Sequence, residues 1–181
     1  MRTMILMGLA AIGMAAGISA QAAQDHAPHA VLVAHAGHAH GHDMGQHAQA
    51  SAQAKLSSTL AVSGCWIRSL PAPAPSAGYF LVKNSGDKPA KLQAASSATY
   101  GMIMLHQTTQ HDGMSKMSET HDIVIPAGGE LEFKPGGYHA MLEKPSAAPA
   151  IGSSVAMDFL FDSGEKASAQ CEVKPANAKT R

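Results

Sequence analysis

The sequence predicts an all-β domain, an antiparallel β-sandwich or barrel, preceded by a signal peptide and a disordered histidine-rich segment. Three observations support this prediction. The chain opens with an apolar run. A low-complexity stretch with seven histidines follows it. From Thr59 to about Lys174, short apolar runs alternate with turn residues, and many short strands at this spacing are typical of sandwiches and barrels.

Residues 1–22 have the pattern of a secretory signal. Arg2 supplies the positive start, the run from Met4 to Ile18 is apolar, and Ala20-Gln21-Ala22 gives a small-x-small cleavage site. The alternative is a membrane anchor, but the run is shorter than the ~20 apolar residues that a bilayer requires. We therefore expect export, cleavage near Ala22 and no stable membrane insertion afterwards.

Residues 23–57 are expected to be disordered, because they offer almost nothing to bury. The alternation in His38-Ala-His40-Gly-His42 places imidazoles two residues apart, and neutral imidazole suits copper, nickel and zinc. We expect the segment to capture metal; the alternative is a soluble linker whose histidines bind nothing. The candidate ligands are His26, His29, His35, His38, His40, His42 and His47.

The predicted β-domain spans residues 58–175, and residues 176–181 are expected to form a flexible C-terminal tail. Turn signals separate its strands, among them Asp112-Gly113 and Pro135-Gly-Gly137. The candidate strands are Thr59–Arg68, Gly78–Asn84, Ala90–Ala95, Met102–Thr108, Met114–Ser118, Asp122–Ile125, Glu130–Phe133, His139–Glu143, Ser154–Phe161 and Lys166–Val173.

Composition excludes several classes of function. Thirteen Lys and Arg balance thirteen Asp and Glu, whereas a nucleic-acid partner requires a basic face. Aromatic residues make up 4% of the chain, too few for stacking platforms. No nucleophile motif, phosphate-binding glycine loop or His-Glu-x-x-His pattern accompanies His111, Asp112, His121 or Asp122, so we do not expect an enzyme.

Two cysteines, Cys65 and Cys171, fall in the first and last candidate strands. In an exported protein such a pair can form a disulfide, and this one would close a loop of about a hundred residues, worth roughly 4–5 kcal/mol. The alternative is a pair of reduced, buried thiols. Cys65 is a weak candidate copper ligand, because no His or Met stands near it in sequence.

The unusual count of 11 His and 11 Met points toward a metal site. His139-Ala-Met141 lies on a candidate strand, where alternate side chains share a face, and the same alternation places His106 at the end of a stripe with Met102 and Met104. Met117 lies on a polar segment, where a core methionine is less expected. We interpret Met102, Met104, Met114 and Met157 as ordinary methionines.

The spacing of these residues resembles that of a known family. His106, Met117, His139 and Met141 match the H-x10-M-x21-H-x-M signature of the periplasmic copper chaperones called PCuAC. The surrounding sequence is also similar, from about Cys65 to Val173: the relevant stretches are Gly78-Tyr-Phe-Leu-Val-Lys-Asn84, Gly113-Met-Ser-Lys-Met117 and Lys134-Pro-Gly-Gly-Tyr-His-Ala-Met-Leu142.

The resemblance implies a cupredoxin-like β-sandwich in the periplasm that binds Cu(I) through those four side chains. It also implies transfer of copper toward the dinuclear copper centre of a haem–copper oxidase, often beside a Sco-type thiol protein. Two departures are a histidine-rich segment at the amino end rather than the carboxyl end, and Gln107 where many relatives carry Glu.

The chemistry of the four ligands agrees with Cu(I). Two thioethers and two neutral imidazoles form a soft, uncharged set, which suits Cu(I) better than zinc or hard ions. A blue-copper electron carrier would need a cysteine thiolate beside the histidines, and neither cysteine is near them in sequence. Beside this Cu(I) site, the histidine-rich segment is expected to capture Cu(II). The other alternative is a metal sink for copper resistance that acts mainly through the histidine-rich segment.

Overall fold

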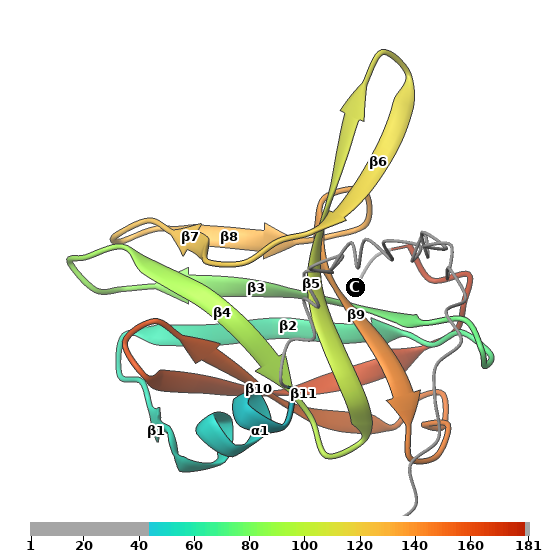
Figure 1. The fold of residues 1–181 in the computed structure, drawn as a ribbon, viewed down its shortest axis with the longest axis horizontal. Helices are drawn as coiled ribbons and strands as arrows, with labels where there is room; N and C mark the ends of the chain where they lie inside the picture. The colour runs from blue at the N-terminus through green and yellow to red at the C-terminus, as the bar shows by residue number, and fades with distance from the viewer. Residues whose placement is uncertain (1–43, 180–181) are drawn as a thin grey trace, which may run out of the picture. The chain divides into compact units, whose positions relative to one another are not determined.

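The computed structural model describes residues 44–179, with side chains from residue 49 onward. The predicted signal peptide lies outside the described residues, as do all the candidate histidines except His47. The described chain forms one helix and eleven strands (Figure 1). These are α1 (Met44–Gln53), β1 (Lys55–Leu56), β2 (Leu60–Arg68), β3 (Ser76–Asn84), β4 (Ala90–Ser96), β5 (Tyr100–His111), β6 (Met114–Glu119), β7 (Ile123–Ile125), β8 (Glu130–Phe133), β9 (Tyr138–Pro145), β10 (Ser154–Phe161) and β11 (Glu165–Lys174).

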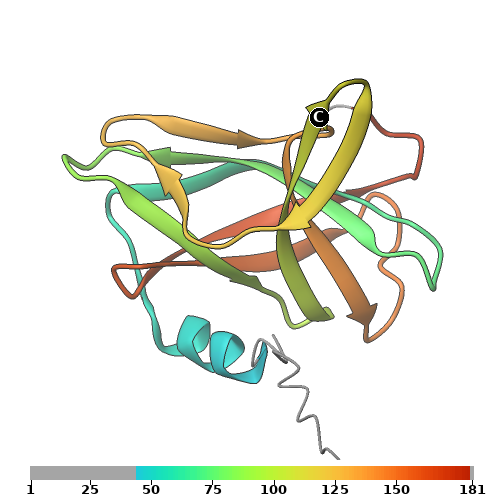
Figure 2. The same ribbon diagram turned by 45° about the horizontal axis from the view of Figure 1, so that its top comes forward.

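All strands belong to one hydrogen-bonded sheet in the order β6-β5-β9-β3-β2-β11-β10-β4-β7, with β1 added to β11 and β8 added to β3 (Figures 1 and 2). Strand β3 pairs with three strands: with β2 along one edge, and with both β9 and β8 along the other. The pairs β1–β11 and β11–β2 are parallel, and the other pairs are antiparallel.

The apolar core lies between two layers of this folded sheet. Phe80 on β3 stacks on Phe133 of β8 at 4.2 Å between ring centroids, and meets Phe159 of β10 at 4.5 Å. Because β3 and β10 are not neighbours in the sheet, this contact places them face to face across the core. The predicted β-sandwich is confirmed, with two parallel pairs in an otherwise antiparallel sheet. The barrel alternative is wrong because the sheet remains open between β6 and β7.

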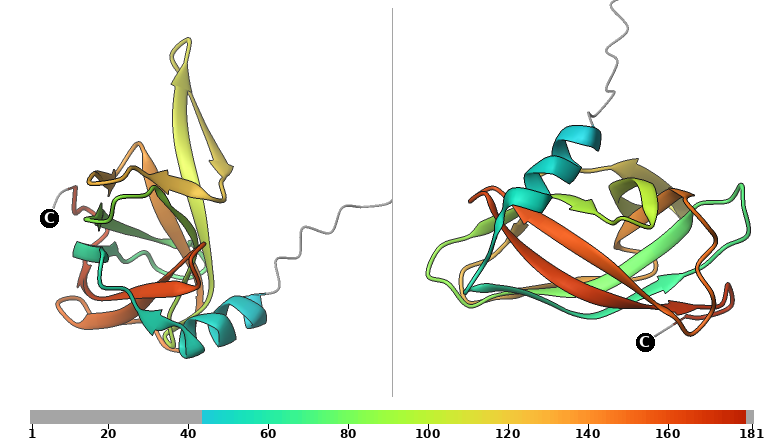
Figure 3. Two further views of the ribbon diagram at one scale, coloured as in Figure 1. Left: turned by 90° about the vertical axis from the view of Figure 1, so that its left-hand side faces the viewer. Right: turned by 90° about the horizontal axis from the view of Figure 1, so that it is seen from below.

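The amino-terminal boundary of the domain differs from the prediction. Residues 44–57 were expected to be disordered, but they form α1 and the two-residue strand β1 (Figure 3). The helix is rich in Ala and Gln, which favour helices, and it packs on β4 and β10, where Ser51 is only 1% exposed. Tertiary packing therefore supplies the burial that the composition of the segment did not suggest.

The carboxyl-terminal segment that was predicted to be flexible makes one contact with the domain. The N–H of Ala178 donates to the carbonyl of Pro175 at 3.0 Å, and Ala178 packs against a small outer cluster of Trp66, Ala77 and Tyr79. Ala178 is thus half-buried on the sheet's outer face, whereas residues 176, 177 and 179 are exposed.

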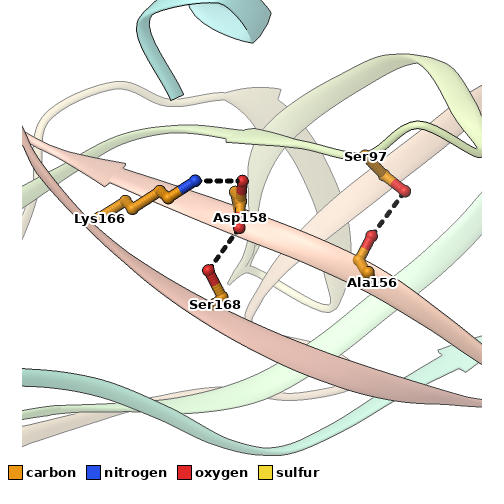
Figure 4. A network of polar contacts seen from close by, with 5 residues as sticks. All are labelled: Ser97, Ala156, Asp158, Lys166 and Ser168. Atoms are coloured by element: carbon orange, nitrogen blue, oxygen red, sulfur yellow. Dashed lines mark hydrogen bonds and ion pairs between the residues drawn. The ribbon is translucent and has the colours of Figure 1, made fainter. Parts of the chain in front are cut away.

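Polar contacts fix the strand pair below the helix. Asp158 on β10 accepts hydrogen bonds from Lys166 and Ser168, both on β11, and Ser97 donates to the carbonyl of Ala156 (Figure 4). The Lys166 ammonium lies 2.9 Å from the Asp158 carboxylate. The two contacts of Asp158 hold β10 in register with β11. Neither of these strands carries a candidate metal ligand.

Cys65 on β2 and Cys171 on β11 form a disulfide across a sequence separation of 106 residues. The bridge is favoured by the parallel pairing of the two strands, in which Trp66 lies opposite Glu172. Because the two buried sulfurs are bonded to each other, the alternative of two reduced thiols is wrong for this structure.

Candidate metal centre

Three strands place the four predicted ligands on one face of the sheet. Strand β9 carries His139 and Met141, and β5 places His106 directly opposite His139. Strand β6 places Met117 opposite Thr108, two residues beyond His106 on β5. Because directly opposed residues and alternate residues along a strand share a face, all four side chains lie on the same side.

The burial pattern of β5 confirms the predicted alternation. Ile103 and Leu105 are buried in the core, whereas Met102, Met104 and His106 are half-buried on the other face. Met104 lies directly opposite Met141. The histidine therefore stands at the end of a sulfur-bearing row, as the sequence indicated.

The β5–β6 hairpin carries Met117 and projects from the rest of the sheet (Figure 1). Met117 is 52% exposed. Its neighbour Met114 is 72% exposed and lies opposite His111 near the hairpin tip. Since Met114 is an odd number of residues from Met117, its side chain points to the opposite face of β6. Met117 therefore lies on the ligand face of β6, and Met114 does not.

His139 is held in one tautomer by the backbone. Its Nδ1 lies 3.0 Å from the carbonyl oxygen of Gly137, which can only accept, so Nδ1 carries the proton. The same carbonyl accepts the N–H of Thr108 at 3.1 Å, which fixes its direction. Gly136, at φ 79°, makes the tight turn before it.

The protonated Nδ1 leaves a lone pair on Nε2 of the neutral ring. Nε2 lies 3.1 Å from the sulfur of Met117. Two electron-pair donors from different strands therefore face each other with no proton between them. A positive ion that accepts both pairs fits this arrangement, and the outer hydrogen bond to Gly137 is the usual support of a metal-binding histidine.

His106 is the second imidazole of the cluster. Its ring lies 5.8 Å from that of His139, edge to face at 88°. Its Nδ1 is buried and has no hydrogen-bond partner among the described residues. Burial lowers the pKa of His106 below its ordinary value of 6.5, and His139 lowers it further, while Glu119 and Glu143 oppose the shift. The ring is therefore held neutral, as a metal ligand must be.

A cavity of about 240 Å³ opens at this cluster, and Met117, His139 and Met141 line it. Arg68 and Tyr79, from the neighbouring strands β2 and β3, also line the cavity and were not predicted. Their signal in the sequence is weak, because only strand register brings residues so distant in the chain to the site. Gly137, whose carbonyl orients His139, was marked only as a turn residue.

A larger apolar cavity of about 650 Å³ adjoins the first. The two share Leu70, Pro75 and Ser76 in their walls. Several prolines line the larger cavity, which makes its walls apolar and stiff. The candidate metal ligands therefore lie beside an apolar hollow rather than in open solvent on every side.

The donor set determines which ions suit the site. Across residues 44–179, no three His, Cys, Asp or Glu side chains gather as a metal site, so a cluster here depends on methionine sulfur. Soft thioethers with neutral imidazoles favour Cu(I) over Zn²⁺, Mg²⁺ and Ca²⁺. A blue-copper thiolate is excluded at Cys65, because its sulfur is bonded to Cys171.

The structure does not relate the histidine-rich segment to this cluster. His26, His29, His35, His38, His40 and His42 lie outside the described residues, and His47 lies in α1. Within the described part of the chain, no helix combines the length and apolar character needed to cross a bilayer.

Comparisons with known proteins place the chain in a family. The model of the LpqE-like family, described as "Putative lipoprotein LpqE-like", matches residues 60–173. A protein named "Putative lipoprotein Lxx21020", from Leifsonia xyli subsp. xyli, is 30% identical over 131 residues, which cover 71% of this chain and 78% of the relative.

Solved structures show the same fold. The copper-bound PCuAC domain from PmoF2 is 22% identical, with a TM-score of 0.54, over 65% of this chain and 93% of that domain. The Cu(I) form of DR1885 from Deinococcus radiodurans is 26% identical, with a TM-score of 0.53, over 75% of this chain and 89% of that protein. The chain therefore belongs to the LpqE-like family, which is the family of the PCuAC domains.

Proposed function

We propose that this protein is a periplasmic copper chaperone that holds Cu(I) through His106, Met117, His139 and Met141. The observation that carries the proposal is the approach of His139 Nε2 to the Met117 sulfur at 3.1 Å, with the proton of His139 held on the other nitrogen by Gly137. Two similar solved structures, the copper-bound PCuAC domain from PmoF2 and the Cu(I) form of DR1885, support copper as the ion that is bound.

The arrangement suits a site that must release its ion. His139 is only 7% exposed and anchored by a backbone hydrogen bond, whereas Met117 lies half-exposed on a projecting hairpin. An incoming ligand can therefore displace Met117 while the imidazoles still hold the ion. Stepwise exchange of this kind lowers the barrier to transfer, because the ion is never released into water.

A delivery role suits a ligand set from which the ion can be released stepwise. We propose that the ion moves toward the dinuclear copper centre of a haem–copper oxidase, either directly or through a Sco-type thiol protein. We also propose that the histidine-rich segment captures Cu(II), since oxidised copper prefers imidazole to thioether. We propose the periplasm as the compartment of these steps, on the basis of the predicted signal peptide.

The test is a Cu(I) competition titration on the full mature chain in which the seven segment histidines are replaced by asparagine. One tight equivalent is expected, and Met141→Ala is expected to weaken it at least tenfold. Met114→Ala is the matched control, because that side chain lies on the opposite face of β6 and should change the Kd by less than twofold.

The same titration discriminates against the metal-sink alternative. If tight copper binding is lost when only the segment histidines are replaced, the tight copper site lies in the histidine-rich segment. Deleting the gene then gives a second readout: loss of oxidase activity at low copper supports delivery, whereas copper sensitivity alone supports a sink.

A further inference from the structure

The described residues that line the cavity at the candidate copper site carry a net positive charge. Arg68 is the one charged side chain among the described residues that line it, and no carboxylate is among them. The four proposed copper ligands are all neutral. A bound Cu(I) ion therefore keeps its full positive charge in a cavity of about 240 Å³ that already holds a guanidinium group.

Arg68 is fixed in place by an aromatic neighbour rather than by an acid. Its Nη2 donates to the hydroxyl of Tyr79 at 2.6 Å, and its guanidinium carbon lies 5.3 Å from the centroid of that ring. The ring of Trp66 packs against that of Tyr79, with 4.5 Å between the ring centroids. In the part of the chain that the structure describes, Arg68 forms no ion pair with a carboxylate.

The Arg68–Tyr79 pair adjoins the ligand cluster directly. The ring of Tyr79 lies 6.5 Å from that of His139, so one aromatic ring separates the guanidinium from the imidazole ligand. Glu119 and Glu143 act on His106, at the other side of the cluster, and neither lines the cavity. The β2 side of the site is therefore positive, and among the described residues Tyr79 is the one acceptor of an Arg68 N–H, which leaves its other N–H donors available.

We propose that Arg68 recognises the anionic sulfur of the partner with which copper is exchanged, a cysteine thiolate. This inference rests on the proposed function and specifies the chemistry of its partner. Two positive charges at short range attract an anion, and Cu(I) selects a soft one, which among protein side chains is the thiolate. The guanidinium donates to the incoming sulfur as it reaches the metal.

The exchange step balances without any change of oxidation state. The thiol first loses its proton to solvent, and its sulfur then forms a bond to Cu(I). The bond between copper and the Met117 thioether breaks in return, and copper remains Cu(I) throughout. Arg68 stabilises this mixed intermediate, because the thiolate brings the negative charge that the neutral ligand set lacks. Arg68 is a positioning residue and does not bind the metal itself.

The experiment measures transfer of Cu(I) from the loaded full chain to two acceptors by stopped flow. One acceptor is a capped peptide with a single cysteine and no other charge, and the other is neocuproine, an uncharged nitrogen ligand. Arg68→Gln is expected to slow transfer to the thiol peptide about tenfold, the change that loss of one nearby charge predicts at intermediate dielectric. Transfer to neocuproine should be slowed far less, and the Kd for Cu(I) should stay the same or fall, because the variant removes a positive charge that repels the ion.

Two further variants separate local charge from other effects. Arg68→Lys keeps the charge and should retain transfer to the thiol peptide within about threefold of wild type. Lys174→Gln removes a positive charge from the same sheet face but outside the cavity, where its ammonium lies over Trp66, and should behave as wild type. If it slows thiol transfer as much as Arg68→Gln does, long-range attraction explains the effect and the proposal fails.

Other outcomes also overturn the proposal. Equal slowing with both acceptors would show that Arg68 only shapes the site, and an unchanged rate with the thiol peptide would show that Arg68 has no part in exchange. Both would leave the proposed function intact, since the Kd for Cu(I) is measured in the same preparations. A wild-type chain without a tight Cu(I) equivalent would instead overturn the proposed function, and this inference with it.

Discussion

The disulfide between Cys65 and Cys171 should supply a large part of the domain's stability. The perturbation is the double variant Cys65→Ala/Cys171→Ala, which removes the bridge and leaves no free thiol. With a sequence separation of 106 residues, the chain-entropy relation gives a loss of about 4.8 kcal/mol in the free energy of unfolding at 25 °C. Many single domains have only about 5–15 kcal/mol in total.

The assay is equilibrium unfolding in urea, followed by the fluorescence of the single tryptophan, Trp66. At a slope of about 2 kcal/mol per molar urea, the loss corresponds to a shift of roughly 2 M in the unfolding midpoint. Reduction of the wild-type chain is the control and should give a similar shift. Because none of the four proposed ligands lies on β2 or β11, the Kd for Cu(I) of the folded variant should remain within about twofold.

A loss below about 1 kcal/mol with an unchanged slope would refute this reasoning. It would mean that the reduced, unfolded chain is nearly as restricted as the bridged one, so that closing the long loop has little entropic effect. A weakened copper affinity in the folded variant would refute the second part, since it would show that the β2–β11 pair shapes the metal cluster.

Three further predictions concern the hairpin, the buried imidazole and the β10–β11 pair. Met117→Ala should raise the dissociation rate of Cu(I) about tenfold, measured by stopped flow; an unchanged rate would contradict exchange through the exposed thioether. His106, with its pKa lowered by burial, should titrate below pH 6.5 when its ring signals are followed by NMR in the apo protein. Its charged form is disfavoured in the fold, so its contribution to stability should be complete above pH 6.5 and lost as pH falls through the lowered pKa. Lys166→Met should cost about 1 kcal/mol in thermal unfolding, because it removes a half-buried partner of Asp158; no change would make this ion pair neutral to stability.

Much of the β-domain was predictable because local signals determine strands and turns. Expected strands such as Ser154–Phe161 agree with the structure to the residue, and the hairpin at Asp112-Gly113 closes where the turn chemistry indicated. The long strand β5 runs to His111, three residues beyond the predicted Thr108, since pairing with β6 extends it past the apolar run. Helix α1 was missed because its composition resembles a linker and its burial comes from tertiary contacts.

The candidate site was predictable only in part. The face shared by His139 and Met141 follows from alternation along one strand, which is local. The approach of Met117 to His139 depends on which strands are neighbours, and composition does not determine that order. Arg68 and Tyr79 reach the site only through the pairing of β2, β3 and β9, so no local pattern could have marked them.

The layout of the ligands also predicts how the sequence of this site can vary over evolutionary time. The pleat of β9 requires one residue between His139 and Met141, so the length of this interval cannot change. The ten residues between His106 and Met117 instead run out along β5 and back along β6. Adding one residue to each strand of this hairpin would keep the methionine opposite Thr108, on the same face. Homologous chains should therefore tolerate insertions of even length in that interval, whereas an odd insertion would need a bulge to return the sulfur to the metal.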